Sequence, residues 1–274
     1  MRLSISNIAW DPAEDEAIAA LLQERGVDAI DIAPGKYFPV PAAAQDADIA
    51  RVRQWWRARG IDIVGMQSLL FGTTGLNLFD AAPVQDAMLA HLGAVCRIGA
   101  GLGATRVVFG SPKNRDRGSL DEEAAIAAAL PFFARLGDIA ADCGVTVCLE
   151  PNPVCYGANF MTTTPATAEV VRRLGHPAIR MQLDTGALAI NGEDAAAELG
   201  RCASLVGHIH ASEPNLVPLG DGATDHAAAA AAIARQLPGH IVTIEMVATS
   251  AEPHAQSVAR ALDVALQHYR GAQA

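Results

Sequence analysis

The chain has 274 residues, of which 51% are hydrophobic, and its 20 basic and 30 acidic residues give a formal net charge of −10. This apolar content is sufficient to bury a large core, which excludes wholesale disorder. The negative charge argues against a nucleic-acid partner, because binding to a phosphate backbone depends on clustered Lys and Arg side chains. We therefore expect a globular protein whose partner is a small molecule.

The first residues do not read as a targeting segment. Residues 1–10 lack the basic start, apolar stretch and cleavage site of a signal peptide, and we expect no membrane span, because no run of about 18 apolar residues suggests one. The five cysteines form no Cys-X-X-Cys pair, so they are expected to be reduced thiols rather than a disulfide framework. The sequence thus predicts a cytoplasmic protein with no membrane partner.

Short β-branched apolar runs alternate with Ala-rich helical stretches along the chain. Each unit takes about 34 residues, close to the length of a βαβ repeat, which leaves no room for a second domain. We predict a single (β/α)₈ TIM barrel over residues 1–274, in the α/β class, with a doubly wound open sheet as the alternative. The eight predicted strands cover residues 2–8, 27–32, 61–67, 104–110, 144–149, 178–183, 204–209 and 240–245.

Four consecutive predicted strands end in a side chain that can bind a metal: Glu150, Asp184, His210 and Glu245. In a parallel barrel the carboxyl ends of the strands share one rim, where three carboxylates would repel one another without a cation. An oxygen-rich set with one imidazole suits Mn²⁺, Mg²⁺ or Co²⁺ better than structural zinc. We expect one divalent ion, with Mn²⁺ preferred; taken singly, each acid could instead be a helix cap or part of a salt bridge.

Further residues near the predicted rim are candidates for substrate binding. His208 precedes His210 by two residues, so its side chain should also point into the barrel. There it could hydrogen-bond a metal ligand or the substrate, or it could be a core histidine. Glu213 could contact a substrate hydroxyl or orient another group of the site, or it could be a solvated loop acid. Lys113 opens the segment Lys-Asn-Arg-Asp-Arg, which could hold a phosphate or carboxylate group.

Amide and aromatic side chains complete the expected pocket. Asn152 and Gln67 follow predicted strands, and each amide offers both a donor and an acceptor to sugar hydroxyls. Trp10, after the first predicted strand, could form a wall of the pocket, although aromatic side chains at strand ends more often pack in the core.

The segments LEPN around Glu150, LDTG around Asp184 and HIHASE around His210, with the strand ending in Glu245, resemble the xylose isomerase-like superfamily of sugar (phosphate) isomerases and epimerases. The resemblance covers residues 144–245 and is nearest in motif to ketose 3-epimerases. It implies a TIM barrel that binds one divalent metal through these four residues and acts on a small carbohydrate. It leaves open whether the chain forms a homo-oligomer.

The resemblance also implies a mechanism. The metal would stabilise an enediolate while Glu150 and Glu245, as the catalytic acid–base pair, remove and return a proton next to the carbonyl of a sugar, sugar phosphate or keto-sugar derivative. One alternative is a lyase or dehydratase that expels a hydroxyl from the same intermediate. Another is a sugar-binding barrel without catalysis. The zinc-dependent endonuclease branch is disfavoured by the acidic charge and by Ala187.

Two departures from the epimerase pattern bear on the substrate. Ala187 stands where those epimerases usually have a His that contacts the substrate. The loop after HIHASE has Pro214, Asn215 and Leu216, where an Arg is common in the family. Both differences argue against a free ketohexose as the ordinary substrate.

Overall fold

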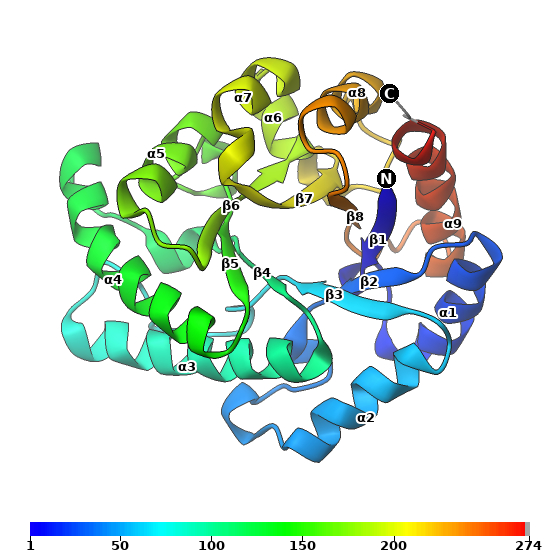
Figure 1. Cartoon of the computed structure of the whole chain (residues 1–274), viewed down its shortest axis with the longest axis horizontal. Coiled ribbons are helices and arrows are strands. Elements are labelled where there is room, and N and C mark those ends of the chain that lie inside the picture. The colour runs from blue at the N-terminus through cyan, green and yellow to red at the C-terminus, as the bar shows by residue number, and fades with distance from the viewer. Residues whose placement is uncertain (272–274) are drawn as a thin grey trace.

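The computed structural model describes residues 1–271 and contains a closed barrel of eight parallel strands. The strands follow one another around the barrel in chain order, and β1 pairs with β8 to close it, with Leu3 opposite Val242 (Figure 1). The predicted TIM barrel is therefore confirmed. The strands are β1 (Arg2–Ser6), β2 (Ala29–Ile32), β3 (Asp62–Met66), β4 (Arg106–Phe109), β5 (Thr146–Leu149), β6 (Ile179–Asp184), β7 (Val206–Ser212) and β8 (Ile241–Glu245).

The helices form a ring outside the barrel, as Figure 1 shows. Several of them end at glycine: Gly103, after the third helix, has a φ of 90° and Gly175, after the fifth, a φ of 62°, values that side chains with a Cβ rarely adopt. The helices are α1 (Asp15–Glu24), α2 (Asp46–Arg57), α3 (Ala82–Leu102), α4 (Glu122–Asp142), α5 (Thr164–Leu174), α6 (Thr185–Asn191), α7 (Ala195–Cys202), α8 (His226–Gln236) and α9 (His254–Ala265).

Helix α4 departs from one expectation. By length and composition alone it could cross a membrane, although we expected no such segment. It packs between α3 and α5 against β5, and Phe132, Phe133 and Leu136 are fully buried. Because core helices of barrels meet the same compositional test, this helix is weak evidence for a membrane span.

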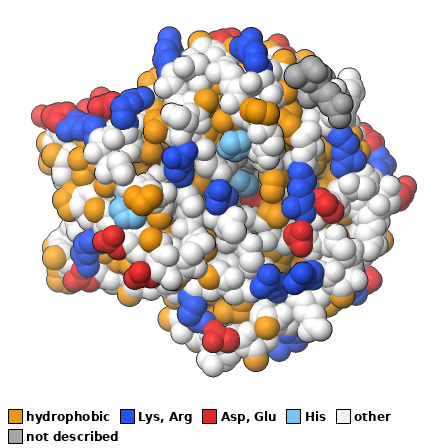
Figure 2. Space-filling view, in the orientation of Figure 1, with side chains coloured by type: hydrophobic (Ala, Val, Ile, Leu, Met, Phe, Trp, Pro, Cys, Tyr) orange, Lys and Arg blue, Asp and Glu red, His pale blue; other side chains and the backbone are white. Residues whose placement is uncertain are grey.

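The two ends of the barrel differ in how their polar groups are satisfied. At the end where the strands begin, Arg2 is paired with Asp28 at 2.9 Å and with Asp62 at 2.8 Å, and Arg106 donates to the carbonyl of Gly207 at 2.9 Å. On the face in Figure 2, basic and acidic side chains are interspersed with small patches of hydrophobic atoms. At the end of the barrel where the strands finish, carboxylates gather around a cavity.

Candidate metal centre

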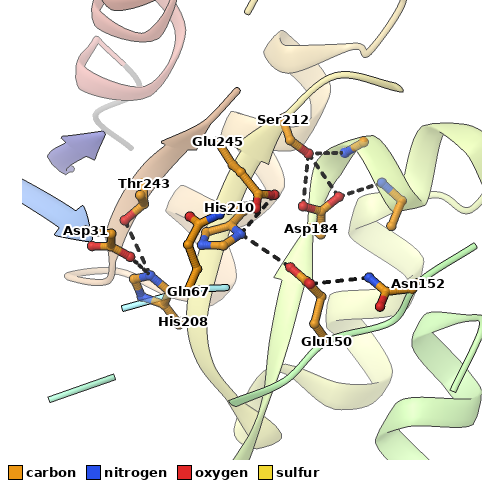
Figure 3. A network of polar contacts seen from close by, with 12 residues as sticks. Asp31, Gln67, Glu150, Asn152, Asp184, His208, His210, Ser212, Thr243 and Glu245 are labelled. Atoms are coloured by element: carbon orange, nitrogen blue, oxygen red, sulfur yellow. Dashed lines mark hydrogen bonds and ion pairs between the residues drawn. The ribbon is translucent and has the colours of Figure 1, made fainter. Parts of the chain in front are cut away.

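The ends of β5 to β8 bring together four side chains predicted as metal ligands. Glu150 follows β5 directly, Asp184 and Glu245 end β6 and β8, and His210 lies within β7. One potential ligand atom from each lies within 4.8 Å of every other. The His210 Nδ1 is 3.3 Å from Glu150 Oε1 and 3.2 Å from Glu245 Oε2, and Figure 3 shows the imidazole between the two carboxylates. We call Glu150, Asp184, His210 and Glu245 the four-residue cluster.

The charge of the four-residue cluster fits a divalent cation. All four side chains are buried, so their charges are poorly screened. Burial, together with the carboxylates of Glu245 and Glu150, raises the pKa of Asp184 to about 8, and the Glu150 Oε1 atom is buried without a hydrogen bond. Burial alone would lower the pKa of His210, but the same two glutamates raise it well above its ordinary value. An oxygen-rich cation site would satisfy these carboxylates.

Hydrogen bonds orient the carboxylates of the cluster. Asp184 Oδ1 accepts from the Ala187 amide at 2.6 Å, and both Asp184 oxygens lie 2.9 Å from Ser212 Oγ, which donates to them. Glu245 Oε1 accepts from the Gln67 amide, and Glu150 Oε2 accepts from Asn152 Nδ2 at 3.3 Å (Figure 3). In both glutamates the second oxygen is therefore the one that faces His210.

Arg115 supports Glu150 from behind. Its guanidinium is fully buried in the turn after β4 and has no acidic partner within the ion-pair distance among the described residues. Nη1 donates to the Glu150 carbonyl at 2.7 Å and Nη2 to the Asn152 side chain, while Nε is buried without a partner. Burial lowers the pKa of Arg115 to about 10, against the opposing effect of Glu150. This role differs from the binding of a phosphate or carboxylate group that the sequence suggested for its segment.

A second polar pair lies below the four-residue cluster inside the barrel. His208 Nε2 is 2.6 Å from Asp31 Oδ2, and Thr243 Oγ1 is 3.4 Å from His208 Nε2 (Figure 3). Ser4 Oγ donates to Asp31 Oδ1 at 3.2 Å. The rings of His208 and His210 meet edge to face with centroids 5.3 Å apart. His208 therefore occupies the deeper position predicted for it, but it is absent from the cavity wall, where direct contact with a substrate would occur.

Asp31 was missed by the sequence analysis. It lies in the middle of β2, in Ala-Ile-Asp-Ile, and it is completely buried. A Cβ on Gly65 of the neighbouring strand would come within 2.3 Å of the Asp31 carboxylate, so this glycine makes room for the acid. An isolated acid inside an apolar strand was the signal available in the sequence.

Two other candidates, Trp10 and Glu213, are buried and already hydrogen-bonded within the protein. Trp10 is fully buried, donates from Nε1 to Asp15 at 2.8 Å and is not among the residues that line the cavity. Glu213 borders the cavity, but its carboxylate accepts from the Gly220 and Thr224 amides at 3.0 Å each. Its Oε1 also lies 3.1 Å from His226 Nε2 of α8, so Glu213 holds the loop after β7 against α8.

The cavity at this end of the barrel has a volume of about 1210 Å³. Glu150, Asp184 and Glu245 lie in its wall with the predicted residues Gln67, Asn152 and Lys113. The Lys113 ammonium donates to the Thr73 carbonyl at 2.9 Å. The wall also includes apolar side chains that the sequence analysis did not assign to the site: Tyr156, Leu216 and Val247.

Comparisons with known proteins agree with this architecture. Residues 19–267 match the family model described as xylose isomerase-like TIM barrel, whereas no curated protein sequence matches significantly. The fold is similar to that of D-psicose 3-epimerase with D-tagatose from Clostridium cellulolyticum H10, with a TM-score of 0.82 and 17% identity over 98% of this chain and 99% of that chain.

Two further solved structures share the fold. For 3-keto-D-glucoside 4-epimerase from E. coli the TM-score is 0.76 at 16% identity, over 95% of this chain and 98% of that one. For the IolI protein with a binding zinc atom it is 0.75 at 16% identity, over 98% and 99%. Because the family model matches most of the sequence, the chain belongs to the xylose isomerase-like TIM barrel family.

Proposed function

We propose that this protein is a divalent-metal-dependent sugar isomerase or epimerase that moves a proton next to the carbonyl of a keto-sugar, with Glu150 and Glu245 as the acid–base pair. The observation that carries the proposal is that one oxygen of each glutamate is fixed by an amide and the other is turned toward His210. Glu150, Asp184, His210 and Glu245 would hold the ion, and Mn²⁺ is the ion we expect.

A bound divalent cation supplies the positive charge that acidifies a carbon-bound hydrogen next to a carbonyl. The side chains then have to move that proton. Glu150 comes from β5 and Glu245 from β8, so one carboxylate can remove the proton while the other returns it on the opposite face, which inverts the carbon. Gln67 and Asn152 restrict the rotation of these two carboxylates, which favours proton transfer from a fixed position.

Two proteins of similar fold support the type of reaction proposed here. A D-psicose 3-epimerase and a 3-keto-D-glucoside 4-epimerase both share this barrel, and each of these names describes inversion of a carbon in a sugar. Because the identities are low, the substrate of this chain has to be inferred from its own cavity.

The test is incorporation of solvent deuterium into a keto-sugar by protein loaded with Mn²⁺. We expect deuterium at the carbon next to the carbonyl, and a loss of about 10²-fold or more in the exchange rate for Glu150→Gln and Glu245→Gln. Glu169→Gln, on the exposed side of α5, is the matched control. Sugar binding without exchange would favour a non-catalytic barrel, and release of water into an unsaturated product would favour a lyase.

A further inference from the structure

The cavity beyond the four-residue cluster is larger than a simple sugar requires. Its volume of about 1210 Å³ exceeds the roughly 300–1,000 Å³ typical of pockets for drug-sized ligands, and a single hexose is smaller than such ligands. A monosaccharide bound at the cluster would therefore leave much of this space to water. The cavity therefore has room for a further part of a substrate beside the sugar.

The outer part of the cavity is apolar and exposed. Six large hydrophobic side chains are exposed among the described residues, and three of them, Phe71, Tyr156 and Val247, line this one cavity. Phe71 is 85% exposed. Exposed apolar side chains that gather at one concave site mark a binding surface, because leaving them in water is unfavourable.

Two of these apolar side chains, Tyr156 and Val247, lie on loops that hydrogen bonds connect through the loop after β7. The Tyr156 hydroxyl accepts from the Asn215 amide at 2.6 Å, which joins the loops after β5 and β7. The Val247 amide donates to the Leu216 carbonyl at 3.0 Å, which joins the loops after β7 and β8. Asn215 and Leu216 have φ values of 62° and 53°, a left-handed conformation that these contacts help to maintain. Hydrogen bonds therefore hold the loops that carry Tyr156 and Val247. We call Phe71, Tyr156 and Val247 the apolar rim.

Groups for binding a phosphate are poorly represented in the cavity wall. The two lysines there, Lys36 and Lys113, donate to backbone carbonyls, and Arg115 is turned toward Glu150 and Asn152. The backbone amides of Gly186 and Ala187, at the start of α6, already donate to Ser212 and Asp184. Among the described residues that line the cavity there is no arginine to hold a phosphate through two parallel hydrogen bonds, and each lysine ammonium already donates to the protein.

We infer that the substrate is a keto-sugar that carries an apolar substituent, such as an aryl or alkyl glycoside, rather than a free sugar or a sugar phosphate. The sugar ring lies at the four-residue cluster and the apolar group lies against Phe71, Tyr156 and Val247. This inference rests on the proposed function for the identity of the ring as a keto-sugar. The methyl group of Ala187 in the cavity wall is consistent with it.

The experiment measures affinity, so it does not depend on turnover. Calorimetry on the Mn²⁺-loaded protein compares three probes: phenyl 3-keto-β-D-glucopyranoside, its methyl counterpart and 3-keto-D-glucose 6-phosphate. We expect the phenyl compound to bind about tenfold or more tightly than the methyl compound, and the phosphate to bind no more tightly than the methyl compound. Phe71→Ala should remove most of the phenyl advantage, while Val40→Ala, at another exposed apolar side chain outside the cavity wall, should retain it.

The outcomes separate this inference from the proposed function. Equal affinities for the phenyl and methyl compounds, preference for the phosphate, or no binding of any probe would overturn the inference. Deuterium exchange accompanied by equal affinities would leave the proposed function intact, whereas a phenyl preference without exchange on any probe would overturn the proposed catalysis and leave the apolar subsite. Sedimentation that shows a dimer lost in Phe71→Ala, with no phenyl preference, would assign the rim to self-association and overturn the inference.

Discussion

Two polar groups of similar composition lie one above the other in the barrel, and they differ in how completely their charges are balanced. The lower one pairs a single acid with a single imidazole, Asp31 with His208 at 2.6 Å, and is enclosed by two hydroxyls. The upper one, the four-residue cluster, places three acids around one imidazole and leaves Glu150 Oε1 without a hydrogen bond. Asp31 and His208, taken together with His210, and the four-residue cluster each bring enough potential ligand atoms together to hold a metal ion. The excess of unpaired negative charge is what distinguishes a centre that needs a cation from a pair that is complete without one.

The largest expected effect is on metal binding by the four-residue cluster. Asp184→Asn removes one charge and one anionic oxygen donor, so we expect the affinity for Mn²⁺ to fall by more than about 100-fold, beyond the effect of losing an outer-shell contact. Titration of the metal-depleted protein with Mn²⁺ measures this change. The control is Asp138→Asn, at a largely exposed carboxylate. Unchanged affinity in Asp184→Asn would place the ion elsewhere.

The next effect tests whether Arg115 organises the cluster without touching the ion. Arg115→Lys keeps a positive charge, but one ammonium cannot reproduce the two directed bonds to Glu150 and Asn152. We expect the Mn²⁺ affinity to fall by about 10- to 100-fold. Lys113→Ala should have little effect on the metal, because Lys113 donates to the Thr73 carbonyl. If the two variants bind Mn²⁺ equally, the positioning role of Arg115 is wrong.

The Asp31–His208 pair should affect stability more than metal binding. Asp31→Asn replaces a buried charged acceptor, and we expect the free energy of unfolding to fall by about 1–3 kcal/mol. The Mn²⁺ affinity should change by less than about tenfold, the lower end of the effect of losing a ligand's direct partner. Urea unfolding and Mn²⁺ titration of the same variant measure the two quantities. If the Mn²⁺ affinity falls by more than about tenfold, the Asp31–His208 pair is part of the metal centre.

The comparison also explains what could be predicted from the sequence. The barrel follows from eight regularly spaced apolar runs, and the approach of Glu150, Asp184, His210 and Glu245 follows from their places near strand ends. The burial of Trp10 agrees with the core alternative given for it. Contacts that depend on loop conformation were not predictable. Arg115 lies within an exposed-looking charged segment, yet the turn after β4 buries its guanidinium.

The smallest expected effect concerns how the free energy of unfolding of the metal-free protein depends on pH. The four-residue cluster and the Asp31–His208 pair should contribute to it with opposite signs. The pKa of Asp184 is raised from its ordinary 3.8 to about 8, first by burial and then by Glu245 and Glu150. Folded protein therefore binds this proton more tightly than unfolded protein, and the free energy of unfolding falls as pH rises between these values. The raised pKa of His210 acts in the same direction, because its stabilising contribution is lost as pH rises through the folded-state value.

Asp31 has the opposite dependence. Burial would raise its pKa, but the charge and hydrogen bond of His208 lower it below 3.8, so its stabilising contribution is present above 3.8 and is lost only as the solution becomes strongly acidic. Urea unfolding in the presence of a chelator, between about pH 5 and 8, should show stability falling with pH in the wild type. Asp184→Asn should flatten that slope and Asp31→Asn should leave it. If Asp184→Asn retains the full slope, the excess charge of the four-residue cluster is not what destabilises the metal-free protein, and the contrast between the two groups fails.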